Sequence, residues 1–165
     1  MQDFVHLHVH TQYSLLDGQA SVARLVDKAM KNGMKGIAVT DHGNMFGIKE
    51  FTNYVNKKNS GPKGEVKDLK KRIAGIEAGT IECEDKEAEI AACKAKIVEA
   101  ENKLFKPIIG CEMYVARRTM DLKEGKPDQS GYHLIVLAKN ETGYHNLIKL
   151  VSHLSLIHIS EPTRH

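Results

Sequence analysis

The chain has 165 residues, of which 41% are hydrophobic and 27% are charged, and this is enough for one modest core. Its formal net charge of +3 is too small to indicate a nucleic-acid-binding protein by itself, because that inference needs a concentrated basic face. The sequence has no long apolar span and no hydrophobic signal core, so we expect no membrane association and a cytoplasmic location. The cysteines form neither a disulfide framework nor a CxxC motif, which favours reduced thiols at Cys83, Cys93 and Cys111.

The first expected element lies in FVHLHVHTQYSLLDG, residues 4–18, where His6, His8 and His10 alternate with apolar residues. Successive side chains of a β-strand point to opposite faces, so the imidazoles would gather on one face. A lone histidine on a strand is usually a hydrogen-bonded core residue, but three in alternation are much rarer by chance. The pattern therefore predicts a first strand that contributes ligands to a transition-metal site.

A helix is expected next, because apolar residues recur at helical spacing in DGQASVARLVDKAMKNG: Val22, Leu25, Val26 and Met30. Gly33 ends this pattern. A short buried strand at 37–39 then enters a polar loop, and a second helix covers about 48–55. This β-α-β alternation predicts a parallel sheet with right-handed crossovers.

The segment 58–104 differs from its surroundings, since it is rich in Lys, Glu and Ala. Two runs have the three-four spacing of paired helices: Val66, Leu69, Ile73 and Ile76, then Ile90, Cys93, Ile97, Ala100 and Leu104. Gly75, Gly79 and Thr80 weaken the helix between them. We expect a helical hairpin inserted in a barrel-like α/β frame. Its charges are most simply solvated faces, and a docking arm for a partner is the alternative.

Two further strands are expected at 106–116 and 132–140. A last helix follows from residue 141, with Leu147, Ile148 and Val151 on one face.

Polar side chains follow or lie in each expected strand, and in parallel α/β folds the strand ends form the active site. These residues are His8, His10, Asp17, Asp41, His42, Glu112 and His133. Each has a simpler explanation alone: Asp41 as a helix cap or turn residue, His42 as a turn donor, Glu112 as the partner of a surface lysine, and His133 as an edge-strand residue. Together they favour a multinuclear hydrolytic metal centre.

The segments HLHVHTQYSLLDG, VTDHGNMFG, KPIIGCEMYVA and HLIVLAKNETGYHNLIKLVS closely resemble the amino-terminal PHP (polymerase and histidinol phosphatase) domains of bacterial DNA polymerase III alpha subunits. The resemblance covers the chain to about residue 152 except for the hairpin. The pairing of SLLDG with TDHGNMFG points to the replicative branch of the family. This resemblance implies an α/β fold, a partial, truncated and distorted (β/α)7 barrel, with the hairpin inserted.

The resemblance also implies roles for individual residues. The HxH of the first motif matches His8 and His10, as ligands of one ion. The histidine of TDH matches His42 and the acid of LLDG matches Asp17, both at another ion. Up to three divalent transition-metal ions are implied in a complete domain, with zinc favoured and manganese or iron as alternatives.

The glutamate of the GCE strand matches Glu112, as the bridging ligand, and the histidine that opens the next strand matches His133. His6 stands where many relatives carry Asp, and we place it behind the ligands. Asp41 is expected to orient the ligands from the same outer position.

The family's later barrel motifs, with an Asp-x-His pair and another His or Cys ligand, have no match, and neither do the polymerase palm, fingers and thumb. We therefore expect barrel segments at 1–57 and 106–153 around a hairpin at 58–105. The remainder, 154–165, resembles a translated transposase adapter used in sequencing libraries, so we expect a non-native tail. The alternative is a native fifth strand with His158 as a ligand.

For full-length proteins the resemblance implies DNA-directed DNA synthesis, a nucleotidyl transfer that uses DNA, deoxynucleoside triphosphates and magnesium. A proofreading exonuclease subunit and a sliding clamp are the implied partners. For the PHP part it implies a metal-dependent 3′–5′ exonuclease or phosphoesterase. Two alternatives stay open: a free-standing PHP phosphoesterase for small phosphate monoesters, and a structural metal module that binds the proofreading exonuclease subunit.

Overall fold

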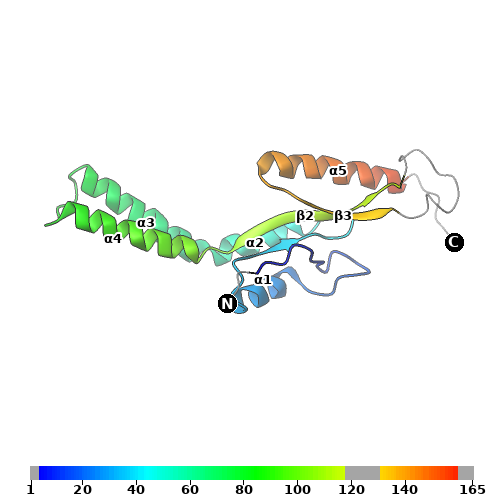
Figure 1. Cartoon of the computed structure of the whole chain (residues 1–165), viewed down its shortest axis with the longest axis horizontal. Coiled ribbons are helices and arrows are strands. Elements are labelled where there is room, and N and C mark those ends of the chain that lie inside the picture. Colours follow the sequence, from blue (N-terminus) through cyan, green and yellow to red (C-terminus); the bar gives the residue numbers. More distant parts are fainter. Residues whose placement is uncertain (1–3, 118–130, 160–165) are drawn as a thin grey trace. The chain divides into compact units, whose positions relative to one another are not determined.

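The computed structural model describes residues 4–117 and 131–159, with the backbone alone described at 154–159. It is a mixed α/β structure (Figure 1). The elements, in chain order, are α1 Val22–Lys31, β1 Gly36–Val39, α2 Ile48–Lys58, α3 Ser60–Glu77, α4 Lys86–Asn102, β2 Lys106–Val115, β3 Tyr132–Leu137 and α5 Glu141–Ile159. The chain forms two compact units, residues 53–106 and the remainder. In the described part of the chain, no helix is long and apolar enough to cross a membrane.

The sheet has the strand order β1-β2-β3. The direction of β3 differs from the parallel sheet that the sequence predicted. The bridge between His42 and Glu112, next to β1, is parallel, as expected. However, β2 and β3 are antiparallel, with Gly110 opposite Leu137 and Val115 opposite Tyr132. A parallel pair needs a crossover that covers the sheet, usually a helix, and the polar segment 116–131 lacks the apolar period of one.

The predicted first strand is also corrected, because residues 4–10 form no regular strand. This segment does run beside β1, since the Ala38 N–H donates to the His6 carbonyl and the Thr40 N–H donates to the Val9 carbonyl. The Val9 N–H, in contrast, donates to the Thr40 hydroxyl at 2.9 Å. A side chain therefore replaces a backbone partner, and the ladder is interrupted.

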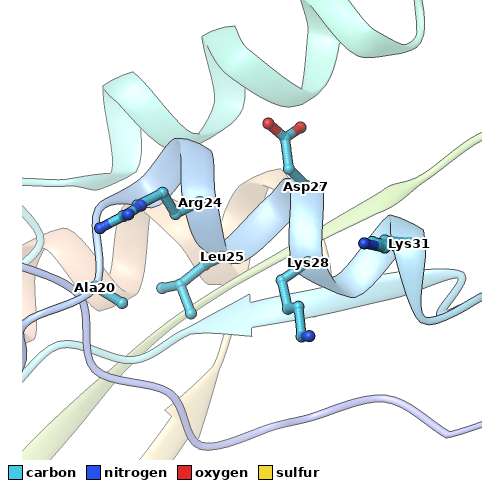
Figure 2. A pocket seen from close by; sticks show the side chains of 6 residues that line it. All are labelled: Ala20, Arg24, Leu25, Asp27, Lys28 and Lys31. Carbon is cyan, nitrogen blue, oxygen red and sulfur yellow. The ribbon is translucent and has the colours of Figure 1, made fainter.

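The predicted helices around β1 are confirmed. Ser21 caps α1 by accepting from the Arg24 N–H, and the buried face consists of Val22, Val26 and Ala29. Gly33 has a φ of 76° directly after the helix, a conformation that favours glycine and reverses the chain toward β1. On the other face of α1, a groove is lined by Ala20, Arg24, Leu25, Asp27, Lys28 and Lys31 (Figure 2). This lining contains no residue that the sequence predicts for the metal site.

The side chains of β2 alternate between two environments. Cys111 and Met113 pack against Leu147 of α5, with Val136 and Val151 at the edge of this core. The two residues between and after them, Glu112 and Tyr114, consequently point to the opposite face of the sheet. Figure 1 shows α5 along one side of the strands and α1 on the other. One face of β2 is thus core, and the other is free to carry chemistry.

Helix α5 and the cysteines complete this unit. Leu147 is buried and Val151 is half-buried, but Ile148 is 38% exposed, so the expectation that it shares their face is wrong. The buried face runs through Tyr144, Leu147 and Val151, the i, i+3, i+7 positions of a helix. All three cysteines are free thiols, as predicted. Burial raises the pKa of the Cys111 thiol to about 11.

In the unit 53–106, α3 and α4 pack against each other, and the buried Ile76, Cys93 and Ala100 belong to the predicted seams. The turn between the helices contains Gly79, with a φ of 72°. At the other end, the amide of Asn59 donates to the Phe105 carbonyl at 2.8 Å and accepts from the Phe105 N–H at 2.9 Å. These paired hydrogen bonds join the two ends of the helical segment.

Candidate metal centre

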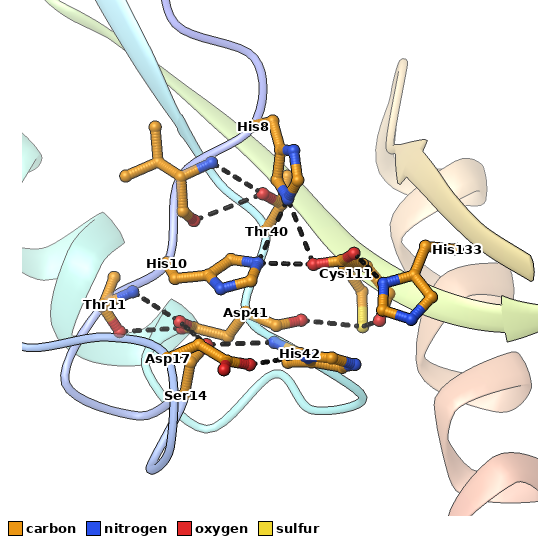
Figure 3. A network of polar contacts seen from close by, with 12 residues as sticks. His8, His10, Thr11, Ser14, Asp17, Thr40, Asp41, His42, Cys111 and His133 are labelled. Atoms are coloured by element: carbon orange, nitrogen blue, oxygen red, sulfur yellow. Dashed lines mark hydrogen bonds and ion pairs between the residues drawn. The ribbon is translucent and has the colours of Figure 1, made fainter. Parts of the chain in front are cut away.

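Asp41 holds together the two loops that carry the centre. Its side chain is 1% exposed and accepts from the Thr11 N–H at 2.6 Å, the Thr11 hydroxyl at 2.8 Å and the Ser14 hydroxyl at 2.7 Å (Figure 3). Ser14 in turn accepts from the His42 N–H at 3.0 Å. Because a buried carboxylate needs several donors, these bonds hold the loop after His10 against the end of β1.

Glu112 is the acceptor on which three imidazoles converge. Its Oε2 lies 3.1 Å from His8 Nε2 and 2.5 Å from His10 Nε2, and its Oε1 lies 2.5 Å from His133 Nδ1. Burial raises the pKa of this carboxyl, but the hydrogen bonds from His133, His8 and His10 outweigh it and lower the pKa to about 2. The carboxylate is therefore ionised at neutral pH, the form that binds cations.

A second group adjoins the first. The His42 Nδ1 lies 2.7 Å from Asp17 Oδ2, and the rings of His10 and His42 are 5.7 Å apart. The other ring nitrogen of His42, Nε2, is buried and has no hydrogen-bond partner among the described residues. Buried polar atoms normally have partners, and an imidazole nitrogen without one is available to coordinate a metal ion.

The arrangement fits divalent metal ions. The ligand atoms of His8, His10 and Glu112 lie within 4.8 Å of one another, as do those of His10, Asp17 and His42. The His8 and His10 Nε2 atoms are 3.1 Å apart, near the roughly 3.3 Å between two nitrogens of a tetrahedral zinc site. Imidazole nitrogens and carboxylate oxygens are ligands that zinc, iron and manganese accept. Both groups could hold an ion, and His10 belongs to both.

The six ligands predicted from the sequence therefore come together. His133 does so because β3 is antiparallel: the start of β3 lies beside the end of β2, and Tyr114 pairs with His133. In the parallel sheet that the sequence predicted, the start of that strand would lie at the opposite edge. His6 is not one of these six residues, and its ring packs edge-on against that of Phe4, with the ring centroids 4.7 Å apart. The side chains of His8 and His133 are about half exposed, so the centre is open to solvent.

Three residues of the site were not predicted. Thr11 directly follows the HxH motif and Ser14 lies three residues later, and their hydroxyl groups were a usable signal for hydrogen bonds to a nearby acid. Tyr114 lies two residues after Glu112, on the same face of β2, so strand alternation could have found it. Burial raises the pKa of Tyr114, and the negative charges of Asp17 and Glu112 add to this.

Comparisons with known proteins found a matching family model and similar proteins. The PHP domain family model matches residues 6–164. The chain is similar to DNA polymerase III subunit alpha of Borreliella burgdorferi, at 41% identity over 152 residues, which are 90% of this chain and 9% of the relative. The same protein of Treponema pallidum is 40% identical, and that of Aquifex aeolicus 32% identical, each over 90% of this chain. The chain spans 9% and 10% of these two relatives.

Proposed function

Because the chain belongs to the PHP domain family, we propose that it is the PHP part of a replicative DNA polymerase and that its histidine and carboxylate cluster is a multinuclear metal centre. The polymerase assignment is supported by the names of the relatives and by their 90% coverage of this chain. DNA synthesis, its deoxynucleoside triphosphates and its magnesium belong, in this proposal, to the larger part of the relatives that the match does not reach. A proofreading exonuclease subunit and a sliding clamp are the proposed partners, in the cytoplasm.

The proposed ligands are the six residues that converge. His8 and His10 would hold one ion, Asp17 and His42 another, and Glu112 would bridge them, with His133 as a further ligand. The observation that carries this proposal is the contact of three imidazoles with one buried carboxylate, beside a buried imidazole nitrogen without a partner. Asp41 would keep the two ligand loops in place, and His6 remains proposed only as a residue behind them.

The proposed reaction is hydrolysis of a phosphodiester at the 3′ end of DNA. Bound divalent ions would supply Lewis-acid activation of the phosphate and of water. The protein's own part is to hold the ligands ionised and oriented. Glu112 remains a carboxylate because its pKa is about 2, and Asp17 orients the His42 ring through Nδ1. The half-exposed His8, His133 and Asp17 leave the centre accessible to a substrate, which favours catalysis over a closed structural site.

The proposed fold includes more than the described three-stranded sheet. We propose that segments 1–57 and 106–153 belong to a distorted (β/α)7 barrel, that 58–105 is an inserted helical hairpin, and that 154–165 is a non-native tail. The close ends of the helical segment, joined through Asn59 and Phe105, support an insertion. The helical backbone at 154–159 contradicts a fifth strand at His158, whose remaining neighbours 160–165 lie outside the described residues.

The test is metal titration combined with hydrolysis assays on the full chain. Calorimetric titration with Zn²⁺ and Mn²⁺ should show binding that His42→Ala and Glu112→Gln weaken. His145→Ala is the control, because His145 is an exposed histidine of α5. The metal-loaded chain should shorten 5′-labelled single-stranded DNA from its 3′ end.

Each other outcome contradicts a defined part of the proposal. Bound metal without hydrolysis would indicate the structural module. Hydrolysis of p-nitrophenyl phosphate but not of DNA would indicate a free-standing phosphoesterase. A chain that binds neither ion would overturn the metal centre.

A further inference from the structure

Three aromatic rings from three separate segments meet beside the centre. His42 follows β1, Tyr114 lies in β2 and His133 lies in β3. The centroid of the Tyr114 ring is 4.7 Å from that of His42 and 4.7 Å from that of His133, and the two imidazoles are 5.0 Å apart. The planes of Tyr114 and His42 are inclined by 35°, and those of Tyr114 and His133 by 81°. Tyr114 therefore contacts both imidazoles at once.

The sheet keeps the Tyr114 ring in this place. Met113, the preceding residue, packs into the core with Leu147, so strand alternation directs Tyr114 to the side of Glu112. The β2–β3 register places His133 directly opposite Tyr114. Neighbours across antiparallel strands have side chains close enough to interact.

The two imidazoles need such a contact. Among the described residues, the His133 ring makes one hydrogen bond, from Nδ1 to Glu112, and half of this side chain is exposed. The His42 ring is bonded through Nδ1 to Asp17, whose side chain is itself 46% exposed. A ring held by one hydrogen bond can rotate about it, whereas a metal site needs its ligands within about 10–20° of the productive orientation. Tilted and edge-on aromatic contacts restrict this rotation.

We propose that Tyr114 is a positioning residue for the metal centre, whose ring orients His42 and His133 together. The inference rests on the proposed metal centre and adds a residue to it. His42 precedes Glu112 in the sequence and His133 follows it. One ring that contacts both imidazoles would keep these two ligands in a fixed position relative to each other. The role is assigned to the ring, because the ring makes the contacts with both imidazoles.

The experiment compares four forms of the full chain: wild type, Tyr114→Phe, Tyr114→Thr and Tyr132→Thr. Threonine favours strands but has no ring. Tyr132 is the matched control, because it is a 60% exposed tyrosine on the neighbouring rung, opposite Val115. The measurements are calorimetric titration with Zn²⁺ and the visible absorption spectrum of the Co²⁺ form, which reports coordination geometry.

We expect Tyr114→Phe and Tyr132→Thr to match the wild type. Tyr114→Thr should bind at least one ion about 10- to 100-fold more weakly, the usual effect of removing a group that orients a ligand, and should change the Co²⁺ spectrum. If Tyr114→Thr loses its far-ultraviolet circular dichroism, Tyr114→Leu replaces it in the same comparison.

Wild-type affinity and spectrum in Tyr114→Thr would overturn this inference alone. Equal losses in Tyr114→Phe and Tyr114→Thr would assign the effect to the hydroxyl and overturn the role of the ring. Equal losses in Tyr114→Thr and Tyr132→Thr would show a general effect on the sheet. A wild-type chain that binds neither Zn²⁺ nor Co²⁺ would instead overturn the metal centre itself.

Discussion

Glu112 combines burial with a low pKa: it is 4% exposed, and its pKa is lowered to about 2. Burial alone would favour the protonated acid. Three imidazoles reverse this effect by donating to its two oxygens. A single glutamate on β2 therefore joins histidines that lie more than a hundred positions apart in the sequence.

This carboxylate should make the metal-free protein sensitive to acid. A pKa lowered in the folded state means that Glu112 contributes stability above its ordinary value of 4.5, and that this contribution is lost as the pH falls from about 4.5 to about 2. The lowered pKa corresponds to about 3 kcal/mol of stability. Urea unfolding in EDTA, measured from pH 7 to pH 2, should show this loss, and Glu112→Gln should flatten it.

Glu141→Gln is the control for the acid series, since the Glu141 side chain is 90% exposed and lies in the same compact unit. It should keep the acid dependence of the wild type. An acid limb that is as steep in Glu112→Gln as in the wild type would show that other groups cause it.

At the scale of elements, the helical segment 53–106 forms a compact unit of its own. Its ends are hydrogen-bonded to each other through Asn59 and Phe105, and its buried residues include Ile76 and Cys93, from both helices. The six proposed ligands all belong to the other compact unit. The proposed metal centre therefore takes no ligand from α3 or α4.

We predict that removal of 58–105, with Lys57 joined to Lys106 by a short linker, leaves zinc affinity unchanged. The ends of the segment are already adjacent, so a short linker can close the gap without strain. Calorimetric titration measures the affinity, and His42→Ala in the shortened chain is the control for binding at the centre. Loss of zinc binding after the deletion would show that the segment is not peripheral.

At the scale of the whole molecule, the final residues should contribute little. The described contacts of α5 with the sheet come from Leu147 and Val151, both before residue 154. We predict that a chain cut after His153 has the same melting temperature and the same zinc affinity as the full chain. Differential scanning calorimetry and zinc titration test this. A fall in melting temperature, or loss of zinc binding in His158→Ala, would make the tail part of the native structure.

Much of this protein could be predicted from the sequence, because many of its signals are local. The spacing of Val22 and Val26 gives a helix and the run at 37–39 gives a strand. His8, His10, Asp17 and His42 stand in short motifs beside expected strand ends, and Glu112 stands within the next strand, so the composition of the candidate centre was also readable. These inferences depend on residues a few positions apart.

Only the tertiary structure decided the direction of β3, the irregular path of residues 4–10 and the contacts of Tyr114. Each depends on a partner that is distant in the sequence. Strand β3 pairs with β2, from which the segment 116–131 separates it in the sequence. The Val9 N–H donates to the Thr40 hydroxyl instead of to a backbone carbonyl. Periodicity shows which face of an element is apolar, but it is the same for parallel and antiparallel neighbours. Strand direction and register arise from non-local hydrogen bonds and packing, and these bring His133 to Glu112.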